Sequence, residues 1–499
     1  MNLFKKAACA SLAALLLVSA CACGSPEDPE TTQAASEAGN AGTEGETEYR
    51  EPLDLPEDLT FPNQTLTFMT RDEGSDWTTT EIFADEEDFA SSNISEAVHT
   101  RNVTILDKYG VTIDHLVTPT GDMPSKVNLA VQSGGNDFQA VISNAVNATS
   151  MSSNGLIWNL LDTEIEYLDL DKPWWDNQLT EGIIINDMVF FATGDLLTAD
   201  NDATFVMMFN KDIAAEYNVP SIYSLVDNYE WTLDKLYEFE QKVEGIDGGD
   251  GKLDHDTDLV PFAMTNDSYY SVLYAGGIKL VGRDSETNSP IYALDVERAD
   301  NLATKARKVF AKNLIFRLDN TDSVIEAGKV CFGGGHALFF GECLQCVERL
   351  RGYDIEFGVI PYPQYDENQK AYYHMMHSTG SVVCIPRQIS GENLEMTSAM
   401  LEAMAYYSQD TLTKQYYEIN LTSKYSKDEQ SGPMIDLILA TRVFDLAYYY
   451  DWGELLPLLT SALQEDSTAQ VSSANRKFSK QITAAIEKTL KDIANNYKE

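Results

Sequence analysis

Gln64-Thr-Leu-Thr-Phe-Met69 begins the stretch that decides the fold, and Phe138-Gln-Ala-Val-Ile-Ser143 ends it. These two segments and Val111–Leu116 are alternating or apolar runs, which predict three β-strands. Between them, Ile94–Tyr109 has amphipathic helical spacing, and Lys126–Ser133 predicts a shorter helix. Each helix is followed by a glycine that suits a helix C-terminus. The order strand, helix, strand, helix, strand predicts parallel α/β units.

Two loops follow predicted strands of this stretch. Ligands of parallel α/β sheets bind beyond the carboxyl ends of the strands. The loops Arg71–Trp77 and Ser143–Asn147 are therefore candidate binding loops, with Trp77 and Asn144 as candidate ligand contacts.

The N-terminus has the pattern of an export signal. Lys5 and Lys6 precede the apolar run Ala7–Val18, which is shorter than the roughly 20 residues of a membrane span. Val18-Ser19-Ala20-Cys21 resembles the bacterial lipobox, which implies removal of residues 1–20 and acylation of Cys21, with palmitate as the expected chain. Ordinary secretion is the alternative. We expect a protein held by lipid on the extracytoplasmic face of the cell membrane.

Composition bounds the rest of the chain. Gly24–Asp58 consists mainly of small, polar and acidic residues, so we predict a flexible tether over 21–60. The chain has 79 acidic and 35 basic residues, a formal charge of −44, which argues against nucleic acid as a partner. About 440 residues follow the tether, enough for two large lobes.

Metal and redox signals are weak. The six histidines are scattered, and the acidic loop Asp247–Asp258 departs from calcium-loop spacing, so a solvated turn is expected there and a weak ion site is the alternative. Cys343-Leu-Gln-Cys346 has the spacing of a redox or zinc half-site. It lies in Ala337–Arg351, which reads as a helix with an apolar face, and this favours buried structural thiols over a disulfide. We expect no metal and no cofactor.

Catalytic motifs are also weak. Gly333–His336 lacks the ending of a phosphate-binding loop, and His374-Met-Met-His377 has no third ligand and reads as a strand. A Gly-x-Ser-x-Gly motif is absent. A catalytic pair of carboxylates, as glycosidases use, is compatible with the sequence because acidic residues are abundant. We assign no catalytic residue and expect a protein that is not an enzyme.

A family resemblance rests on several segments in a fixed order. The chain resembles the extracellular solute-binding proteins of family 1, the maltose-binding-like receptors of ABC importers, over about residues 62–499. The segments that carry it are Ala97–Ile113, Asp171–Asp176, Phe190–Asp195, Met208–Asp212, Glu230–Asp234 and Phe357–Pro363.

The resemblance implies a two-lobed α/β fold of the periplasmic-binding-protein-like type II class, with hinged lobes and a helical C-terminal segment. By analogy, lobe one spans 61–198 and 378–412, and lobe two spans 199–377 and 413–499. The hinge crossings would fall near Leu197–Thr204, near Met376–Ser381 and near 412, which makes Asp200 and His377 candidate contacts. Tyr270 and Gly277 fall where the family often lines the cleft of its second lobe.

Aromatic residues are the remaining site candidates, because sugars present apolar faces to rings. Trp174 and Trp175 are adjacent, so if the segment is extended, at least one should be partly exposed. Trp452 ends an aromatic run beginning at Tyr448 and is a candidate contact, with core packing as the alternative. Trp231 is expected to be structural.

The sequence therefore predicts a monomeric receptor that captures a carbohydrate, with an oligosaccharide favoured, and delivers it to the permease subunits of an ABC transporter. A binder of peptides or other non-sugar solutes is the first alternative. A cell-surface glycoside hydrolase is the second.

Overall fold

The computed structural model describes residues 50–72, 81–85, 93–244, 249, 253–350, 352–417, 428, 430–468 and 470–497. The chain divides into two units, 1–50 and 51–499, and the fold below is that of the second unit. The expected signal, Cys21, most of the tether and Trp77 lie outside the described residues. Among the residues that are described, no helix combines the length and apolar character needed to cross a membrane.

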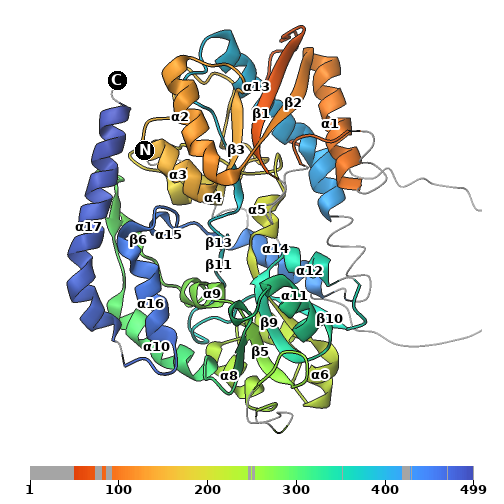
Figure 1. The fold of residues 1–499 in the computed structure, drawn as a ribbon, viewed down its shortest axis with the longest axis vertical. Helices are drawn as coiled ribbons and strands as arrows, with labels where there is room; N and C mark the ends of the chain where they lie inside the picture. The colour runs from red at the N-terminus through yellow and green to blue at the C-terminus, as the bar shows by residue number, and fades with distance from the viewer. Residues whose placement is uncertain are drawn as a thin grey trace, which may run out of the picture. The chain divides into compact units, whose positions relative to one another are not determined.

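The first sheet contains the three strands predicted between Gln64 and Ser143 (Figure 1). Its strands in spatial order are β12 (Ser381–Cys384), β3 (Ala140–Asn144), β1 (Gln64–Arg71) and β2 (Val111–Thr118). β1 is parallel to β2 and β3, and β12 is antiparallel to β3. Its helices include α1 (Asn93–Tyr109), α2 (Met123–Ser133), α3 (Ala145–Ser153) and α13 (Glu392–Ser408). The predicted strand and helix order of this region is confirmed. Gly110 and Gly134 end their helices with φ values of 73° and 69°.

The second sheet is mixed. Its strands in spatial order are β10 (Phe357–Ile360), β4 (Phe205–Asn210), β9 (Ala337–Cys343), β5 (Val260–Met264) and β8 (Ile315–Arg317). The prediction of a helix over Ala337–Arg351 is wrong, because its first half is β9 and only Gln345–Arg349 forms a helix, α12. β9 pairs with β4 on one side and β5 on the other. A central strand is apolar on both faces, and a short apolar run of this kind cannot be distinguished from a helix by periodicity.

The other elements are helices and short strands outside the two main sheets. The helices are α4 (Asn177–Ile183), α5 (Ala199–Asp202), α6 (Lys211–Glu216), α7 (Ile222–Asp227), α8 (Leu233–Glu240), α9 (Asp267–Ala275), α10 (Val296–Val309), α11 (Val324–Gly328), α14 (Ser431–Ala440), α15 (Leu446–Tyr449), α16 (Leu455–Leu463) and α17 (Val471–Asn496). The short strands are β6 (Val281–Arg283), β7 (Pro290–Tyr292), β11 (His374–Met375) and β13 (Arg442–Val443). β6 pairs with β7, and β11 pairs with β13.

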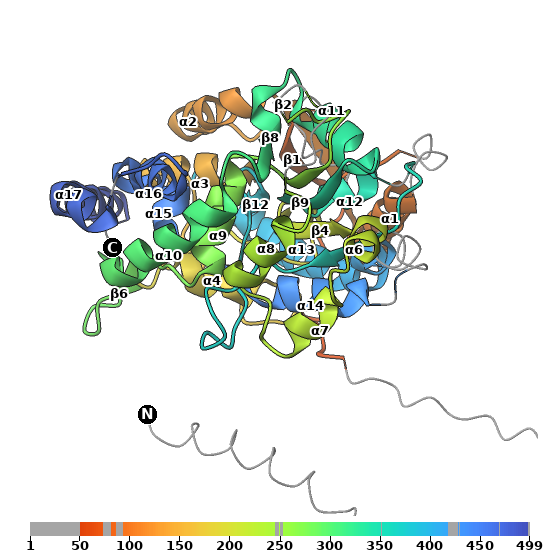
Figure 2. The ribbon, with the colours of Figure 1, turned by 90° about the horizontal axis from the view of Figure 1, so that it is seen from below.

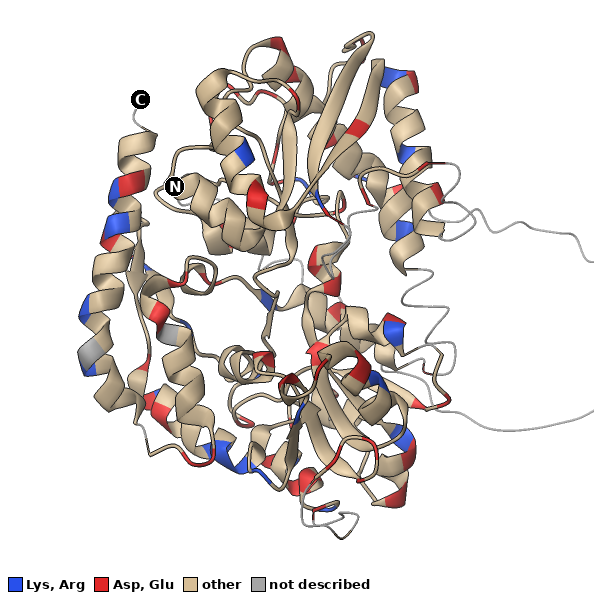
Figure 3. Cartoon of the chain, viewed as in Figure 1, with Lys and Arg blue, Asp and Glu red and all other residues tan. Residues whose placement is uncertain are grey.

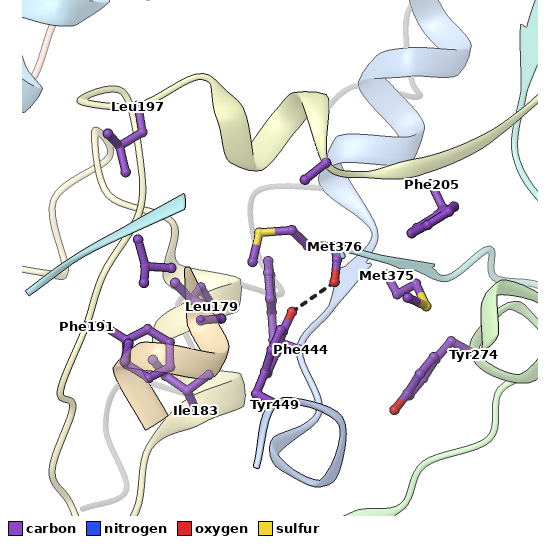
Figure 4. Packing of buried hydrophobic residues seen from close by; sticks show 14 of the residues in the cluster. Leu179, Ile183, Phe191, Leu197, Phe205, Tyr274, Met375, Met376, Phe444 and Tyr449 are labelled. Atoms are coloured by element: carbon purple, nitrogen blue, oxygen red, sulfur yellow. Dashed lines mark hydrogen bonds between the residues drawn. The ribbon is translucent and has the colours of Figure 1, made fainter. Parts of the chain in front are cut away.

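One chain segment crosses from the second sheet to the first. After β11, Met376 pairs with Thr204, and the His377 N–H donates to the Ala203 carbonyl at 2.9 Å. The segment then enters the first sheet at Ser381, the first residue of β12. Figure 4 shows Met375 and Met376 beside Phe205, with the Tyr449 hydroxyl donating to the Met376 carbonyl at 3.3 Å.

Asp200, a candidate contact, lies in a buried ion pair instead. Its Oδ2 accepts a bond from Arg442 Nη1 at 3.0 Å, and Asn201 Oδ1 accepts another from the same nitrogen at 2.9 Å. Asp176 pairs with the other terminal nitrogen of Arg442. Burial raises the pKa of Asp200 to about 6, and Arg442 opposes that rise. Asp200 is therefore a structural residue of the crossing region, which corrects the expectation.

Trp174 and Trp175 are both buried, with 1% and 3% of their surface exposed, so the expectation of a partly exposed indole is wrong. The segment turns at this point instead of running extended, and this lets both rings face the same way. The two indole N–H groups donate to Oε1 and Oε2 of Glu402 on α13, at 3.0 and 2.8 Å. We therefore drop both tryptophans from the candidate site.

Trp452 belongs to the core that packs against α17. It is 3% exposed, and its indole N–H donates to Thr489 Oγ1 on α17 at 2.9 Å. The alternative of core packing is thus the correct one. Trp231 is fully buried and donates to the Pro361 carbonyl at 2.9 Å, which confirms its structural role.

α17 contacts both halves of the described unit. Near its start, the Val471 N–H donates to Asp300 Oδ1 on α10 at 2.6 Å. Near its end, Asn496 Nδ2 donates to the Ser153 carbonyl at the end of α3, at 2.9 Å. Figures 1 and 2 show α17 and α16 side by side along one flank.

Buried carboxyl groups make stability depend on pH, and Glu402 is the clearest case. Burial raises its pKa to about 7, although both indoles stabilise the charged form. Between pH ~4.5 and ~7 the folded protein therefore holds a proton that the unfolded chain releases. This group's stabilisation is fully present below pH ~4.5 and is lost as the pH rises through 7.

We expect Glu402→Gln to flatten the pH dependence of the free energy of unfolding. A neutral side chain removes a slope of up to about 1.4 kcal/mol per pH unit in this interval. Urea unfolding at pH 5, 6, 7 and 8 measures it, with the exposed Glu392→Gln as control. Parallel curves for Glu402→Gln and the unsubstituted protein would contradict the assignment.

Candidate functional site

The carboxyl ends of parallel strands from both sheets meet at the crossing segment. β1 and β3 end at Arg71 and Asn144 in the first sheet, and β5 and β9 end at Met264 and Cys343 in the second. The residues that gather here are called the edge cluster: Arg71, Asp72, Asn144, Asp267, Tyr270, Glu342, His377, Thr379 and Tyr448. Strand ends of this kind are where α/β proteins place ligand contacts.

Arg71 fixes the half of the edge cluster that belongs to the first sheet. Its Nη1 donates to the Thr379 carbonyl at 2.7 Å, and its Nη2 donates to Ser381 Oγ at 3.0 Å. Burial lowers the pKa of Arg71 to about 10, with Glu81 and Asp72 opposing, so the guanidinium stays charged near neutral pH. This side chain therefore joins the end of β1 to the crossing segment.

Asn144 and Asp72 order the neighbouring loops. Asn144 Oδ1 accepts the Asn147 N–H at 2.7 Å and caps the start of α3. Asp72 Oδ1 accepts the N–H of Thr120 at 3.4 Å, and Asn147 Nδ2 donates to the Thr120 carbonyl at 2.8 Å. Asn144 is mostly buried, and its side-chain oxygen is used by the cap of α3.

His377 joins the edge cluster to the second sheet. Its Nε2 lies 3.7 Å from Oδ2 of Asp267, the first residue of α9, and its Nδ1 lies 2.5 Å from Thr379 Oγ1. Burial raises the pKa of Glu342 at the end of β9 to about 7, although the Cys343 N–H donates to its Oε1. Asp267 raises the same pKa further, and His377 lowers it. The half of the edge cluster around His377 thus combines two carboxyl groups with an imidazole.

Two tyrosines supply ring surface. The rings of Tyr270 and Tyr448 are 5.9 Å apart between centroids, and both side chains are half-buried. Burial raises the pKa of both phenols, so each remains a neutral hydroxyl at neutral pH. The Ser378 N–H donates to the Tyr448 hydroxyl at 3.3 Å. Such residues offer an apolar face beside a polar edge.

The structure brings together three of the predicted contacts and separates the others. Asn144, Tyr270 and His377 lie in the edge cluster. Trp174, Trp175, Asp200 and Trp452 are buried elsewhere, and Trp77 lies outside the described residues. Gly277, with a φ of 75°, lines a different cavity, described below.

Sequence reasoning missed several members of the edge cluster. Asp267 starts the helix after the buried strand Val260–Met264, so the strand-end rule applied there would have found it. Glu342 was missed because the segment Ala337–Arg351, which contains it, was predicted as a helix and not as a strand. Tyr448 lies in the aromatic run whose last residue was chosen instead. Nothing local in the sequence distinguishes Thr379.

The thiols beside Glu342 are structural. Cys343 and Cys346 are free and buried, which agrees with the favoured prediction. Ligand atoms of Glu342 and both thiols lie within 4.8 Å of one another, a spacing a metal could use. A hydrogen bond with Cys346, together with burial, raises the pKa of Cys343 well above its ordinary value. That favours the protonated thiol over the thiolate that metals require.

His374 is likewise structural. It pairs with Arg442 in the short β11–β13 sheet, as the strand prediction for this neighbourhood expected. Burial lowers its pKa to about 3, and its Nδ1 lies 3.0 Å from Thr441 Oγ1. The two histidines at positions 374 and 377 therefore have different surroundings and form no pair.

Comparison with solved structures defines the class of fold. A scan of protein-family profiles and a search of curated proteins both find no match. The GacH receptor of Streptomyces glaucescens, solved unliganded and with acarbose, aligns with a TM-score of 0.51 at 13% identity, over 89% of this chain and 100% of that one. The maltose/maltodextrin-binding domain MalE of Bdellovibrio bacteriovorus, bound to maltotriose, aligns with a TM-score of 0.52 at 13% identity, over 86% and 100%.

A third structure is similar to the same extent. The cyclic α-maltosyl-1,6-maltose binding protein of Arthrobacter globiformis aligns with a TM-score of 0.55 at 13% identity, over 87% of this chain and 100% of that one. The chain therefore has the two-lobed, periplasmic-binding-protein-like fold of maltose-binding proteins, as the family resemblance predicted. At this identity the likeness concerns the fold.

Arg71 generates a stability prediction. Arg71→Met removes a charged donor from the Thr379 carbonyl and from Ser381, so we expect the free energy of unfolding to fall by roughly 2–4 kcal/mol. Arg71→Lys should lose less, because it keeps the charge. Urea denaturation measures both, with the exposed Lys480→Met as control. Equal stability of Arg71→Met and the control would disprove the linking role.

Proposed function

We propose that this protein is a receptor that captures a carbohydrate, with an oligosaccharide favoured, at the edge cluster. It delivers the sugar to an ABC permease. The observation that carries the proposal is the gathering of carboxyl, imidazole, hydroxyl and tyrosine groups where strand ends of the two sheets meet, in a fold of the maltose-binding type.

The chemistry of the edge cluster supports a polyhydroxylated ligand. A sugar needs hydrogen-bond partners around its edge and apolar surface against its faces. Asp267, Glu342 and Thr379 supply the polar groups, and Tyr270 and Tyr448 supply the rings. Solved proteins with this fold were crystallised with acarbose, maltotriose and cycloalternan, which also favours sugars over peptides.

Release of an unchanged ligand follows from a hinge. A sugar that contacts groups from both sheets binds the closed state more tightly than the open one and shifts the equilibrium between them. We keep the limits of lobe one at 61–198 and 378–412, with the rest of 199–499 as lobe two. The strands of each sheet fall within these limits.

The cellular setting is part of the proposal. The extracytoplasmic location, the acylated Cys21, the monomeric state and the permease partner rest on the N-terminal sequence and on the family resemblance. Metabolic labelling with a palmitate analogue, compared with Cys21→Ser, tests the anchor. Equal labelling of the two proteins would disprove it.

Sugar binding is tested directly by calorimetry with a panel that includes maltotriose and cyclic oligosaccharides. We expect one panel member to bind, and Tyr270→Ala to weaken its binding by about 1–3 kcal/mol, the scale of losing a buried aromatic face. Tyr237→Ala on α8 is the matched control.

Chromatography of the recovered sugar completes the experiment. An intact ligand supports a receptor, and cleaved product would establish a hydrolase. A dissociation constant that Tyr270→Ala leaves unchanged would remove the edge cluster as the site.

A further inference from the structure

A cavity of about 710 Å³ shares no lining residue with the edge cluster. Its walls come from α4, the C-terminal end of α9, β6, β13 and the loop around Gln369. Figure 4 shows the apolar packing of its neighbourhood, with Leu179 and Ile183 on α4 and Phe444 close by. Pockets for small molecules commonly have volumes of about 300–1,000 Å³, so this cavity is large enough for a ligand.

The charge of the lining is opposite to that of the chain. Four basic side chains line the cavity, against two acidic ones: Lys279, Arg283, Arg298 and Arg442, with Glu181 and Asp445. The whole chain has a formal charge of −44. Arg442 is already paired with Asp176 and Asp200, so the positive charge of the lining comes from the other three basic side chains, which outnumber Glu181 and Asp445 and attract small anions locally.

Two of these arginines bond only to neutral acceptors among the described residues. Arg298 donates to the Gly276 carbonyl and to Gln369 Oε1, both at 2.8 Å. Arg283 donates to backbone carbonyls of the α4 region, including that of Gly182 at 3.0 Å. These bonds hold each guanidinium in place without neutralising its charge.

Three buried polar atoms of lining residues have no hydrogen-bond partner within the described part of the chain: the Tyr274 hydroxyl, Gln178 Oε1 and Arg442 Nε. Tyr274 is only 4% exposed, and Figure 4 shows its hydroxyl directed away from Met375. Buried polar atoms are nearly always bonded, because an unpaired one is costly. The protein therefore leaves two donors and one acceptor unpaired at a single cavity. An occupant that satisfies them must offer acceptors for the two donors and a donor for the acceptor.

We propose that this cavity binds a small hydroxycarboxylate of about the size of a hexuronic acid. The carboxylate accepts hydrogen bonds from the arginines and from the Tyr274 hydroxyl, and a hydroxyl group of the ligand donates to Gln178 Oε1. Arg298 supplies positive charge that no protein carboxylate neutralises by an ion pair within the described residues, and Arg283 supplies positive charge that Asp445 in the same lining partly balances. The cavity adjoins the edge cluster, because the ring centroids of Tyr274 and Tyr448 are 6.3 Å apart, but the two sites share no lining residue.

Calorimetry on the full mature chain with glucuronate tests the proposal, and glucose is the neutral control probe. We expect glucuronate to bind and glucose not to bind at this site. Tyr274→Phe and Arg298→Gln should each raise the dissociation constant at least tenfold, the scale of a hydrogen bond to a charged group. Lys480→Gln should not change it.

Two further readouts keep the result decisive. Tyr274→Phe removes an unpartnered hydroxyl, so it should fold with an unchanged or higher melting temperature, and loss of binding cannot then be attributed to unfolding. Asp267→Asn alters the edge cluster and should leave glucuronate binding intact. Absence of glucuronate binding, equal affinity for glucose, unchanged affinity in Tyr274→Phe and Arg298→Gln, or loss of binding in Asp267→Asn would each overturn the proposal.

Discussion

The pairing of Arg442 with Asp176 and Asp200 is the interaction on which the arrangement of the two sheets depends. It joins the residue that caps α4, the short helix α5 and the strand β13, which lie far apart in the chain. Burial lowers the pKa of Arg442, but the two carboxylates outweigh that effect and leave the pKa above its ordinary value. Removing one partner from such a buried group leaves an uncompensated charge, which is strongly destabilising. The short β11–β13 sheet contains Arg442 itself, and the crossing segment pairs with Ala203 and Thr204 directly after α5.

The local sequence pattern was sufficient to predict the strands and helices of the first sheet. It was insufficient where contacts with residues distant in the sequence determine the structure. The alternating strand Gln64–Arg71 and the helix Asn93–Tyr109 could be read from periodicity and a terminal glycine. The orientation of Trp174 and Trp175 could not, because Glu402 on a distant helix turns both indoles inward. β9 was misread because a central strand is apolar on both faces.

The residues of the candidate site also divide into those that the sequence predicted and those that only the structure revealed. Asn144 follows from the strand-end rule, and Tyr270 and His377 follow from the family resemblance. Asp267 was open to the same strand-end rule. Arg71 and Glu342 are recognisable only when both sheets are seen together, because Arg71 bonds to the crossing segment and Glu342 interacts electrostatically with His377 in that segment. Figure 3 shows acidic residues spread over the helices and loops, so acidity alone singles out none of them.

The helix α17 has a consequence for how the two halves can move. At about 1.5 Å per residue, its 26 residues form a stiff rod of roughly 39 Å. One end of the rod is attached to α10 and the other to α3, so it fixes a minimum spacing along that flank. Any closure that preserves both attachments must pivot about this flank, and the largest displacement then occurs on the opposite flank of the molecule.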